Sequence, residues 1–484
     1  MKKGELIDRM LQEDEREKEA APKAKTVYTA RTASGQEGRK HTPKPRREEH
    51  SSHTEDHSHP EHGESMHAEH GAHASQEQIY KAQEDNDSAA IKEDIVSLDS
   101  GNTASGILEV MADGFGFIRC ENYLPGEHDV YVAPSQIRRF NLKTGDIVCG
   151  NTKVKSEREK FSALLYVTSV NGYHPSEAQK RTNFEDLTPI FPNVRLRMER
   201  PGGSVAMRVM DIVSPIGKGQ RGMIVSPPKA GKTTLLKEVA KSVKENNPEM
   251  HLIILLIDER PEEVTDIRRS VRANVFYSTF DSPQENHVRV ADMVYERAQR
   301  LVEQGKNVVV LMDSLTRLAR ACNALSPGGR AMSGGLAPGA LDRPKRFFGA
   351  ARNIEEGGSL TIIATVLVET GSRMDDIIFE EFKGTGNAEI KLDRALSEAR
   401  IFPAIDLAKS GTRHEELLLS PAECEGVAMV RRMLGQGHTR EATAQLISML
   451  LKTEKNEDFF KRLKEWLAIW EKEGYTIRSL RSGV

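Results

Sequence analysis

Beyond about residue 200, short apolar runs alternate with stretches of helical periodicity. The runs are MIVS, LIILLID, VVVLMD and LTIIATVLV, and the helical stretches include 233–245 and 288–304. Near-continuous apolar runs are typical of parallel strands that are covered on both faces, and their alternation with helices favours an α/β fold. We therefore predict one α/β domain with a parallel sheet over residues 203–484.

The end of this domain has helical periodicity from 422 to about 473. Leu463, Trp466, Leu467 and Trp470 recur there at helical spacing. An apolar stripe of this kind usually packs on the rest of its domain, and we expect that here. A partner-binding face is the alternative.

Residues 101–176 show a different pattern, in which short alternating segments are separated by glycine. The segments are GILEVM, FGFIR, DVYVAP, GDIVCG and ALLYVTSV. Apolar and polar positions that alternate predict strands, and five such segments in this short stretch favour a small β-barrel. Residues 177–202 are interpreted as a connector, with turns at Thr188-Pro189 and Phe191-Pro192.

The first part of the chain lacks the residues that build a core. Between Arg31 and Gln78, Met66 is the only member of the Ile, Leu, Val, Met, Phe, Trp and Tyr class. Burial cannot offset the entropy of ordering such a segment. We predict a short charged helix at 1–20 and a disordered, low-complexity segment at 21–98.

Histidine is concentrated in that segment, since nine of the fifteen histidines lie between His41 and His73. Neutral imidazoles are good zinc or nickel ligands. The residues that motivate a metal site are His57, His59, His62, His67, His70 and His73. A solvated linker is nevertheless the favoured interpretation.

The formal charge changes sign near residue 100, where the low-complexity segment ends. The 484 residues carry a formal charge of -3, with -7 on residues 1–100 and +4 on residues 101–484. The longest purely apolar runs, 252–257 and 308–312, are far shorter than the ~20 residues of a membrane span. MKKGELIDRM at the start lacks the apolar stretch of a signal peptide. We expect no association with a membrane.

The cysteines point to a reducing compartment. Cys120, Cys149, Cys322 and Cys424 are far apart in the sequence and form no CxxC pair. This pattern argues against a disulfide scaffold or a structural zinc site. We therefore expect a cytoplasmic protein.

A glycine-containing segment follows the first apolar run of the α/β domain. SPPKAGKTT at 226–234 fits GxxxxGK[ST], except that Ser226 replaces the first glycine. Such a loop directs backbone N–H groups and a helix N-terminus at phosphates. Lys232 would reach the β- and γ-phosphates of ATP, and the Thr233 hydroxyl would bind Mg²⁺. The residues expected to contact the nucleotide are Lys229, Ala230, Gly231, Lys232, Thr233 and Thr234. A structural glycine turn is the alternative.

Two other apolar runs end on acidic residues. The run 308–312 is followed by Asp313, and the run 252–257 by Asp258 and Glu259. An aspartate beside a phosphate loop usually holds Mg²⁺, here through water, and the other carboxylate can orient or deprotonate an attacking water molecule. Either acid alone could be a helix cap or a surface residue. Together with the loop, they indicate ATP hydrolysis.

ATPases that work in rings often take an arginine from the neighbouring subunit. Such a residue contributes about 10³–10⁵ in rate. Arg394, Arg400 and Arg413 follow the last predicted core strand. Spacing alone does not choose among these three arginines.

Aromatic residues mark the predicted barrel. Phe115 and Phe117 in DGFGFIR are two residues apart, so they share one face of a strand. On a small barrel such a face is a stacking platform for single-stranded nucleic acid, worth about 1–3 kcal/mol per base. Gly114 and Gly116 leave both rings uncrowded, although the rings could instead form the barrel core. The further residues expected at this site are Arg119, Asp129, Tyr131, Glu159, Lys160 and Phe161.

Long motifs in one order resemble the Rho family of transcription termination factors, over about three quarters of the chain. They are DGFGFIR, YVAPSQIRRFNL, LRMER, SPIGKGQRG, PPKAGKTTLL, IDERPEEVTD, DSLTRLARACN, RPKRFFGAARN, EEFKGTGN and FPAIDLAKSGTRHEELL. The resemblance implies a RecA-like P-loop ATPase core preceded by an OB-type, cold-shock-like barrel. It also implies a homohexameric, ATP-dependent RNA translocase and helicase.

The resemblance also implies roles for particular residues. Glu259 is then the catalytic base, Phe402 stacks on adenine, and Arg413 enters the neighbouring site with the help of Arg400. Arg260 would line the nucleotide site. The stretch Gly217, Lys218, Gly219, Gln220, Arg221 and Gly222 would border the nucleotide, and Arg330 and Arg373 would grip RNA in the pore of the ring.

The implied partners are nascent, pyrimidine-rich single-stranded RNA, further copies of the chain, RNA polymerase and elongation factors. RNA capture or condensate formation by the histidine-rich segment stays open. So does the role of the C-terminal extension, the part of the chain past Phe460. Two rival functions also stay open. A rotary or export ATPase shares the ring ATPase core, and a non-enzymatic RNA-binding regulator could retain an inactive nucleotide fold.

Overall fold

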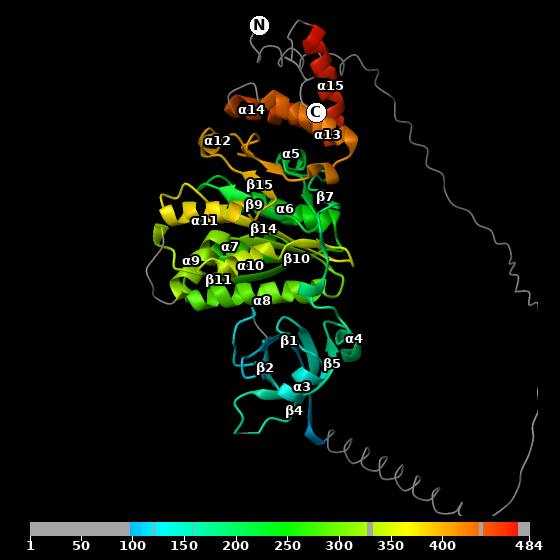
Figure 1. The fold of residues 1–484 in the computed structure, drawn as a ribbon, viewed down its shortest axis with the longest axis vertical. Coiled ribbons are helices and arrows are strands. Elements are labelled where there is room, and N and C mark those ends of the chain that lie inside the picture. Colours follow the sequence, from blue (N-terminus) through cyan, green and yellow to red (C-terminus); the bar gives the residue numbers. More distant parts are fainter. Residues whose placement is uncertain (1–96, 120–121, 157, 327–332, 435–438, 473–484) are drawn as a thin grey trace, which may run out of the picture. The chain divides into compact units, whose positions relative to one another are not determined.

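The computed structural model describes residues 97–119, 122–156, 158–326, 333–434 and 439–472 (Figure 1). The charged helix predicted at 1–20 lies outside these residues, as does nearly all of the low-complexity segment predicted at 21–98.

Residues 99–170 form a closed barrel with strand order β1-β2-β3-β5-β4. The strands are β1 (Asp99–Val110), β2 (Gly116–Arg119), β3 (Val130–Val132), β4 (Ile147–Lys153) and β5 (Ser162–Val170), with α3 (Pro134–Arg139) after β3. The barrel core includes Leu108, Ile118, Val132 and Val148. The predicted small five-stranded barrel is therefore confirmed.

Short elements connect the barrel to the next part of the chain. They are α4 (Pro175–Ala178), the 3₁₀ turn η1 (Phe184–Asp186), β6 (Pro189–Ile190) and β7 (Arg195–Leu196). β6 pairs with β13 (Arg352–Ile354), and β7 pairs with β8 (Ile216–Gly217). The connector therefore joins the edge of the α/β domain through backbone hydrogen bonds.

The α/β domain is built on one sheet with the order β11-β10-β12-β14-β9-β15-β16. The strands are β9 (Arg221–Ser226), β10 (His251–Glu259), β11 (Asn274–Thr279), β12 (Asn307–Asp313), β14 (Ser359–Leu367), β15 (Ala388–Lys391) and β16 (Gly411–Thr412). In this order the strands β11, β10, β12, β14, β9 and β15 are parallel to one another, as predicted. β13 pairs antiparallel with the start of the central strand β14, and β16 pairs antiparallel with β15 at one edge, so the whole sheet is mixed.

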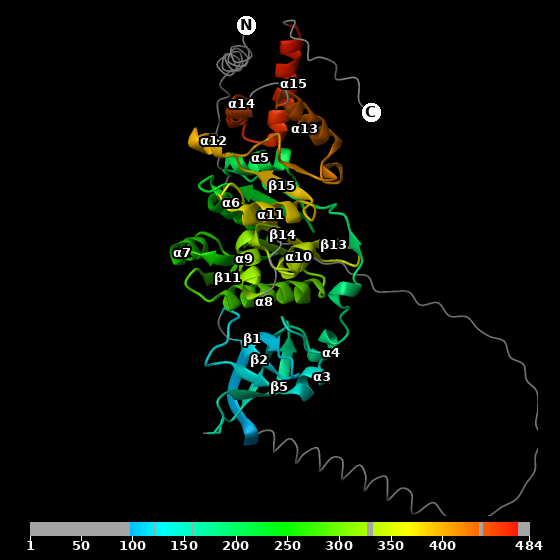
Figure 2. The ribbon, with the colours of Figure 1, turned by 60° about the vertical axis from the view of Figure 1, so that its left-hand side comes forward.

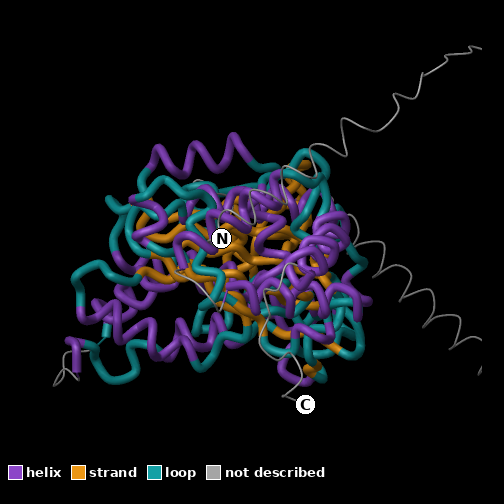
Figure 3. Tube along the Cα trace, turned by 90° about the horizontal axis from the view of Figure 1, so that it is seen from above, coloured by secondary structure: helices purple, strands orange, loops and turns teal. Residues whose placement is uncertain are grey.

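Helices cover both faces of this sheet (Figures 2 and 3). The helices and 3₁₀ turns are α5 (Val205–Val213), α6 (Lys232–Asn246), α7 (Pro261–Ser270), α8 (Gln284–Val302), α9 (Leu315–Leu325), η2 (Ser333–Gly335), α10 (Asp342–Gly349), α11 (Arg373–Lys383), α12 (Arg394–Glu398) and η3 (Glu415–Leu417). Successive residues of β10 alternate between the two faces. Ile254 and Leu256 pack with α5 and α6, whereas Ile253 and Leu255 pack with α8 and α9.

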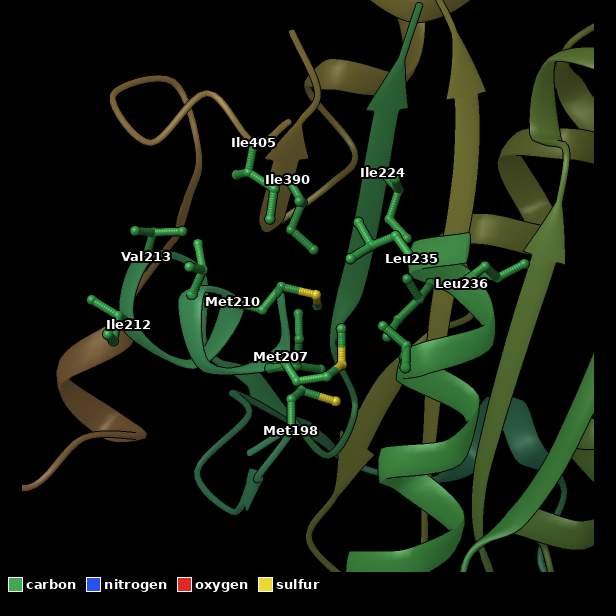
Figure 4. Packing of buried hydrophobic residues seen from close by; sticks show 14 of the residues in the cluster. Met198, Met207, Met210, Ile212, Val213, Ile224, Leu235, Leu236, Ile390 and Ile405 are labelled. Atoms are coloured by element: carbon green, nitrogen blue, oxygen red, sulfur yellow. The ribbon is translucent and has the colours of Figure 1, made fainter. Parts of the chain in front are cut away.

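α5 packs against α6, the helix that follows the phosphate loop. Met207 and Met210 of α5 belong to the same buried cluster as Leu235 and Leu236 of α6 (Figure 4). Ile224 of β9 completes the contact. This packing fixes the start of α6 relative to the sheet.

The chain ends in α13 (Pro421–Leu434), α14 (Thr439–Leu451) and α15 (Asn456–Lys472). Leu463 and Trp466 of α15 are buried in the same cluster as α5 and α6, as expected for a packed stripe. The side chains of Leu467 and Trp470 lie outside the described residues. No helix within the described ranges combines the length and apolarity needed to cross a lipid bilayer.

Candidate functional site

The phosphate-loop segment joins the carboxyl end of β9 to the amino end of α6. Gly231, immediately before α6, has a φ of 93°, which a glycine adopts without strain. Lys229 has a φ of 65°, in the left-handed region that is costly for other residues. The strand, tight loop and helix expected for a phosphate site are therefore all present.

Lys232, the first residue of α6, lies between the two acidic strand ends. Its Nζ donates to Glu259 Oε1 at 3.0 Å and also to Asp313 Oδ1. Burial alone would lower the pKa of Lys232, but Asp313 and Glu259 outweigh burial and raise that pKa. The lysine is therefore a fixed positive charge at the carboxyl edge of the sheet, which is where parallel α/β sheets bind ligands.

A β-bulge aims Glu259 at this site. The pairing of β10 with β11 shifts register between Ile257 and Glu259, and the intervening Asp258 has a φ of 57°. Bulges reorient side chains near functional sites. Glu259 is 3% exposed, and its pKa is raised by burial and by Asp313, against the opposing effect of Lys232 and Arg317.

The two carboxylate oxygens of Asp313, at the end of β12, have different surroundings. Oδ1 accepts hydrogen bonds from Lys232 and from Thr365 Oγ1, the latter at 2.7 Å. Oδ2 is buried and has no hydrogen-bond partner among the described residues. An orphaned carboxylate oxygen close to a phosphate loop fits a bound cation or its water ligands. Thr233, the other residue predicted to hold the metal, is the second residue of α6.

A cavity of about 420 Å³ opens beside the loop. Ala230, Gly231 and Thr234 line one part of it, and Phe402 and Pro403 line another. The Phe402 side chain is 50% exposed, so its ring is available to a planar group. The predicted loop and the predicted stacking residue, which are far apart in the sequence, therefore meet at one pocket.

Arg317 and Thr365 also contribute to this site, and motif spacing did not single them out. Arg317 of α9 lies 3.8 Å from Glu259 and 3.4 Å from Asp258. Its position on the first turn after Asp313, in DSLTRLARACN, was the available signal. Thr365 lies within an apolar strand, and nothing in that pattern marked it.

The four aromatic residues predicted on the barrel form one cluster. The ring centroids of Phe117 lie 5.8 Å from Phe115, 6.0 Å from Tyr131 and 5.1 Å from Phe161. All four rings are partly exposed, and none belongs to the buried core of the barrel. The cluster is therefore a surface feature supported by the core beneath it.

The polar residues around this cluster fall into two groups. Arg119 and Asp129 are buried and bonded to each other, and Arg119 also donates to Glu109 at 2.7 Å. The Arg119 guanidinium lies 4.9 Å from the centroid of the Phe117 ring. The buried Arg119–Asp129 pair therefore supports the aromatic cluster from beneath. Glu159 and Lys160 are exposed, with the Lys160 ammonium 5.3 Å from the Phe161 centroid.

Comparison with known proteins finds a family match for the barrel, which carries the aromatic cluster, and another for the α/β domain, which carries the phosphate loop. Residues 104–176 match the family model described as "Rho termination factor, RNA-binding domain". Residues 206–412 match the "ATP synthase alpha/beta family, nucleotide-binding domain". The chain is 54% identical to the transcription termination factor Rho of Pseudomonas aeruginosa over 368 residues, which cover 75% of this chain and 88% of that protein.

The chain belongs to the Rho family.

Two further similarities complete the comparison. The Rho factor of Escherichia coli K12 is 53% identical over 365 residues, covering 74% of this chain and 87% of that protein. The solved structure of an ATPase from a type III secretion system is 22% identical, with a TM-score of 0.49, and the alignment covers 65% of this chain and 94% of that chain.

The arginines that Rho resemblance assigns to the neighbouring site are exposed. Arg413 follows β16, and Arg400 follows α12 with a φ of 59°. Neither side chain forms an ion pair within the described part of the chain, whereas Arg394 pairs with Glu398 at 2.9 Å. Arg400 and Arg413 thus keep free guanidinium groups.

The stretch 217–222 has mainly structural contacts in the single chain. Gly219 donates to Thr361 Oγ1 at 2.8 Å, and a Cβ on this glycine would lie 2.2 Å from the Asn353 nitrogen. Gln220 and Arg221 bond to Asn387 and Thr385. Lys218 pairs with Glu249 at 3.4 Å. Arg260 is 68% exposed at the start of α7, and none of these residues lines the cavity beside the phosphate loop.

Of the two predicted pore residues, Arg330 lies outside the described residues, and Arg373 is the exposed first residue of α11. The turn before α11 is fixed by Asp375, which accepts two hydrogen bonds from Arg320 at 2.8 Å and one from Thr370 at 2.6 Å. Arg320 belongs to α9, which begins directly after the strand that carries Asp313. One helix therefore joins the nucleotide site to the loop of Arg373.

Proposed function

We propose that this protein is a transcription termination factor that binds single-stranded RNA and hydrolyses ATP in response to it. The observation that carries this proposal is the exposed aromatic cluster on a barrel in the same chain as a phosphate loop with both strand-end acids. A rotary or export ATPase would need the second site but not the first. An inactive regulator would not need Lys232, Glu259 and Asp313 in mutual contact.

In the proposed reaction, Lys232 neutralises charge on the β- and γ-phosphates, and Glu259 orients and deprotonates the attacking water. The raised pKa of Glu259 suits a base that must accept a proton. Thr233 and Asp313 would hold Mg²⁺, with the orphaned Oδ2 of Asp313 facing the ion or its water. Bound Mg²⁺ supplies positive charge to the phosphate oxygens.

We propose further that the working form is the homohexameric ring that the resemblance to Rho implies, in which a neighbouring copy completes each nucleotide site. Asn387 bonds to Arg221 at the amino end of β9, and Arg413 bonds to Asn387. The phosphate loop follows the carboxyl end of the same strand. At about 3.3 Å per residue, β9 separates the two by roughly 20 Å, so we propose that Arg413 serves the site of a neighbour. Arg400 follows α12, whose Ser397 hydroxyl donates to the Lys229 carbonyl of the phosphate loop, so it would assist at that end of the sheet and not beside Arg413.

RNA would meet the protein at two places. The four rings of the barrel would capture pyrimidine-rich nascent RNA by stacking, and phosphate contacts would make capture dependent on salt. Arg330 and Arg373 would then grip RNA in the ring. Because α9 joins Asp313 to the loop of Arg373, hydrolysis could move that loop and pull the strand, which would release the transcript from RNA polymerase.

The experiment that tests this proposal is the rate of ATP hydrolysis with and without RNA, beside a mass measurement of the assembly. We expect hydrolysis that RNA stimulates, most strongly poly(C), from a hexamer. A rate that does not respond to RNA would favour the rotary or export class, and the absence of any hydrolysis would favour the inactive regulator.

A further inference from the structure

The loop after β2, the strand that carries Phe117 of the aromatic cluster, is fastened to the edge of the α/β sheet. The Asn122 side chain donates from Nδ2 to the Tyr277 carbonyl at 2.7 Å, and its Oδ1 accepts from the Tyr277 N–H at 3.2 Å. The Tyr123 ring stacks on Phe276, with the two centroids 3.9 Å apart. Both partners belong to β11, the edge strand of the sheet. Asn122 therefore occupies backbone groups that an edge strand otherwise leaves open.

β11 pairs with the strand that carries the proposed catalytic base. Thr279, two residues after Tyr277, pairs with Glu259 across the β-bulge. The Phe280 N–H donates to the Glu259 carbonyl at 3.2 Å. The backbone of Glu259 is thus held on one side by β11, and the contact of Asn122 with β11 lies only two residues from that pairing.

A second contact joins the barrel to α8. The Arg289 guanidinium donates to both carboxylate oxygens of Glu109, at 2.7 and 2.9 Å. Glu109 is opposite Phe117 in the pairing of β1 with β2. It also accepts from Arg119, whose guanidinium lies beside the Phe117 ring. One carboxylate therefore connects the support of the aromatic cluster to a helix of the α/β domain.

α8 connects this contact to β11. His287 lies two residues before Arg289, so the two side chains are about 200° apart around the helix. Arg289 faces the barrel, whereas the buried His287 faces the sheet, where its Nδ1 lies 2.7 Å from Ser278 Oγ. Ser278 is the residue between Tyr277 and Thr279 on β11. The loop after β2 and α8 therefore reach neighbouring residues of β11 by two routes.

Close packing fixes the barrel on α8. Gly145 of the barrel lies against this helix, and a Cβ on Gly145 would be 2.5 Å from the Glu296 carbonyl carbon. Arg297 of α8 donates to Asn171 Oδ1 at 2.5 Å and to the Gly145 carbonyl at 3.3 Å. Protein interiors packed this closely transmit strain, so a restraint on the barrel is passed to α8.

We propose that Asn122 and Arg289 are positioning residues that couple RNA capture on the barrel to the catalytic base. RNA that stacks on the rings restrains β2 and Glu109. The loop after β2 and α8 pass this restraint to β11, which then holds Glu259 in its productive orientation for more of the time. This inference rests on the proposed RNA-dependent hydrolysis and adds the residues that connect its two sites.

The test is ATP hydrolysis by the full chain, titrated with oligo(C), in a variant that combines Asn122→Gly with Arg289→Met. Asn122 has a φ of 44°, which glycine adopts without strain, and methionine removes the charge of arginine while keeping an unbranched side chain. The RNA-free rate and the half-saturating concentration of oligo(C) should stay unchanged. The RNA-stimulated rate should fall about fivefold or more, the lower end of typical couplings between sites. A merely structural role would lower the RNA-free rate as well.

The matched control combines Asn102→Gly with Arg432→Met, because both residues are exposed and lie outside these contacts. It should keep full stimulation by oligo(C). If the variant of Asn122 and Arg289 is stimulated as strongly as the unaltered chain, the coupling is wrong and the proposed function is unaffected. If the unaltered chain does not respond to oligo(C), the proposed function fails and the coupling fails with it.

Hydrogen exchange gives a second readout that does not depend on turnover. Exchange of the backbone amides of residues 274–287 is measured with a non-hydrolysable ATP analogue bound, before and after addition of oligo(C). Oligo(C) should slow this exchange in the unaltered chain and in the control, but not in the variant of Asn122 and Arg289. Bound oligo(C) that leaves the exchange unchanged in the unaltered chain would overturn the coupling.

Discussion

The backbone N–H of Arg413 donates a hydrogen bond to the carbonyl of Asn387 at 2.8 Å, at the amino end of β9 and β15. The phosphate loop lies at the opposite end of β9. This relationship separates Arg413 from the nucleotide pocket of its own chain.

We therefore expect Arg413→Ala to bind ATP normally and to lose about 10³-fold or more in hydrolysis. Mixing this variant with Lys232→Ala should restore activity, because some interfaces then combine an intact Lys232 with an intact Arg413. Arg394→Ala is the control, since that arginine is exposed and paired with Glu398. Mixtures that stay as inactive as either variant would contradict action in trans.

Lys232→Ala should abolish turnover while leaving RNA capture intact. The buried carboxylates of Glu259 and Asp313 would lose the cation between them, and we expect a loss of at least about 10²-fold, typical of removing one stabilising donor. ATPase assays and fluorescence anisotropy with labelled oligo(C) measure the two effects. Lys237→Ala, whose lysine pairs with Asp266 farther along α6, should keep both activities. Undiminished hydrolysis in Lys232→Ala would refute the assigned phosphate site.

Hydrolysis should fall at low pH with a midpoint above the usual pKa of a glutamate. The pKa of Glu259 is raised by burial and by Asp313, and a base is inactive once it is protonated. The rate is therefore lost as pH decreases through this raised pKa. Arg317→Gln removes a nearby positive charge that lowers the pKa of Glu259. In this variant the hydrolysis rate should therefore fall at a still higher pH. A midpoint that does not move would mean that another group controls the loss of rate at low pH.

Phe117→Ala should weaken binding of oligo(C) by about 1–3 kcal/mol, the value of one stacked base. Phe117 contacts three other rings, so its loss also loosens the platform. The matched control is Tyr166→Ala, an exposed aromatic residue of β5 outside this cluster. If affinity for oligo(C) is unchanged in Phe117→Ala while the barrel stays folded, RNA is captured elsewhere.

Much of the fold followed from local patterns. Apolar runs such as 252–257 and 308–312 predicted buried parallel strands, and the glycine-separated segments predicted the barrel. The antiparallel pairs made by β13 and β16 were not predicted, because strands of two or three residues carry too few positions to show a period.

The site was predictable where a short motif marks each of its parts. The phosphate loop and both strand-end acids lie together as expected. The β-bulge at Asp258 was missed because its cause is the pairing of β10 with β11, which a single strand does not reveal. Arg119 appeared from sequence to reach toward RNA, yet Asp129 and Glu109 hold it below the rings, and only the closed barrel brings these three together.

The most direct test of the central claim is the rate of ATP hydrolysis by the full chain with and without poly(C). Coupling of an RNA-capturing barrel to an ATPase core predicts a low rate without RNA and a rate many times higher with poly(C). A substantial rate that poly(C) leaves unchanged would contradict the account.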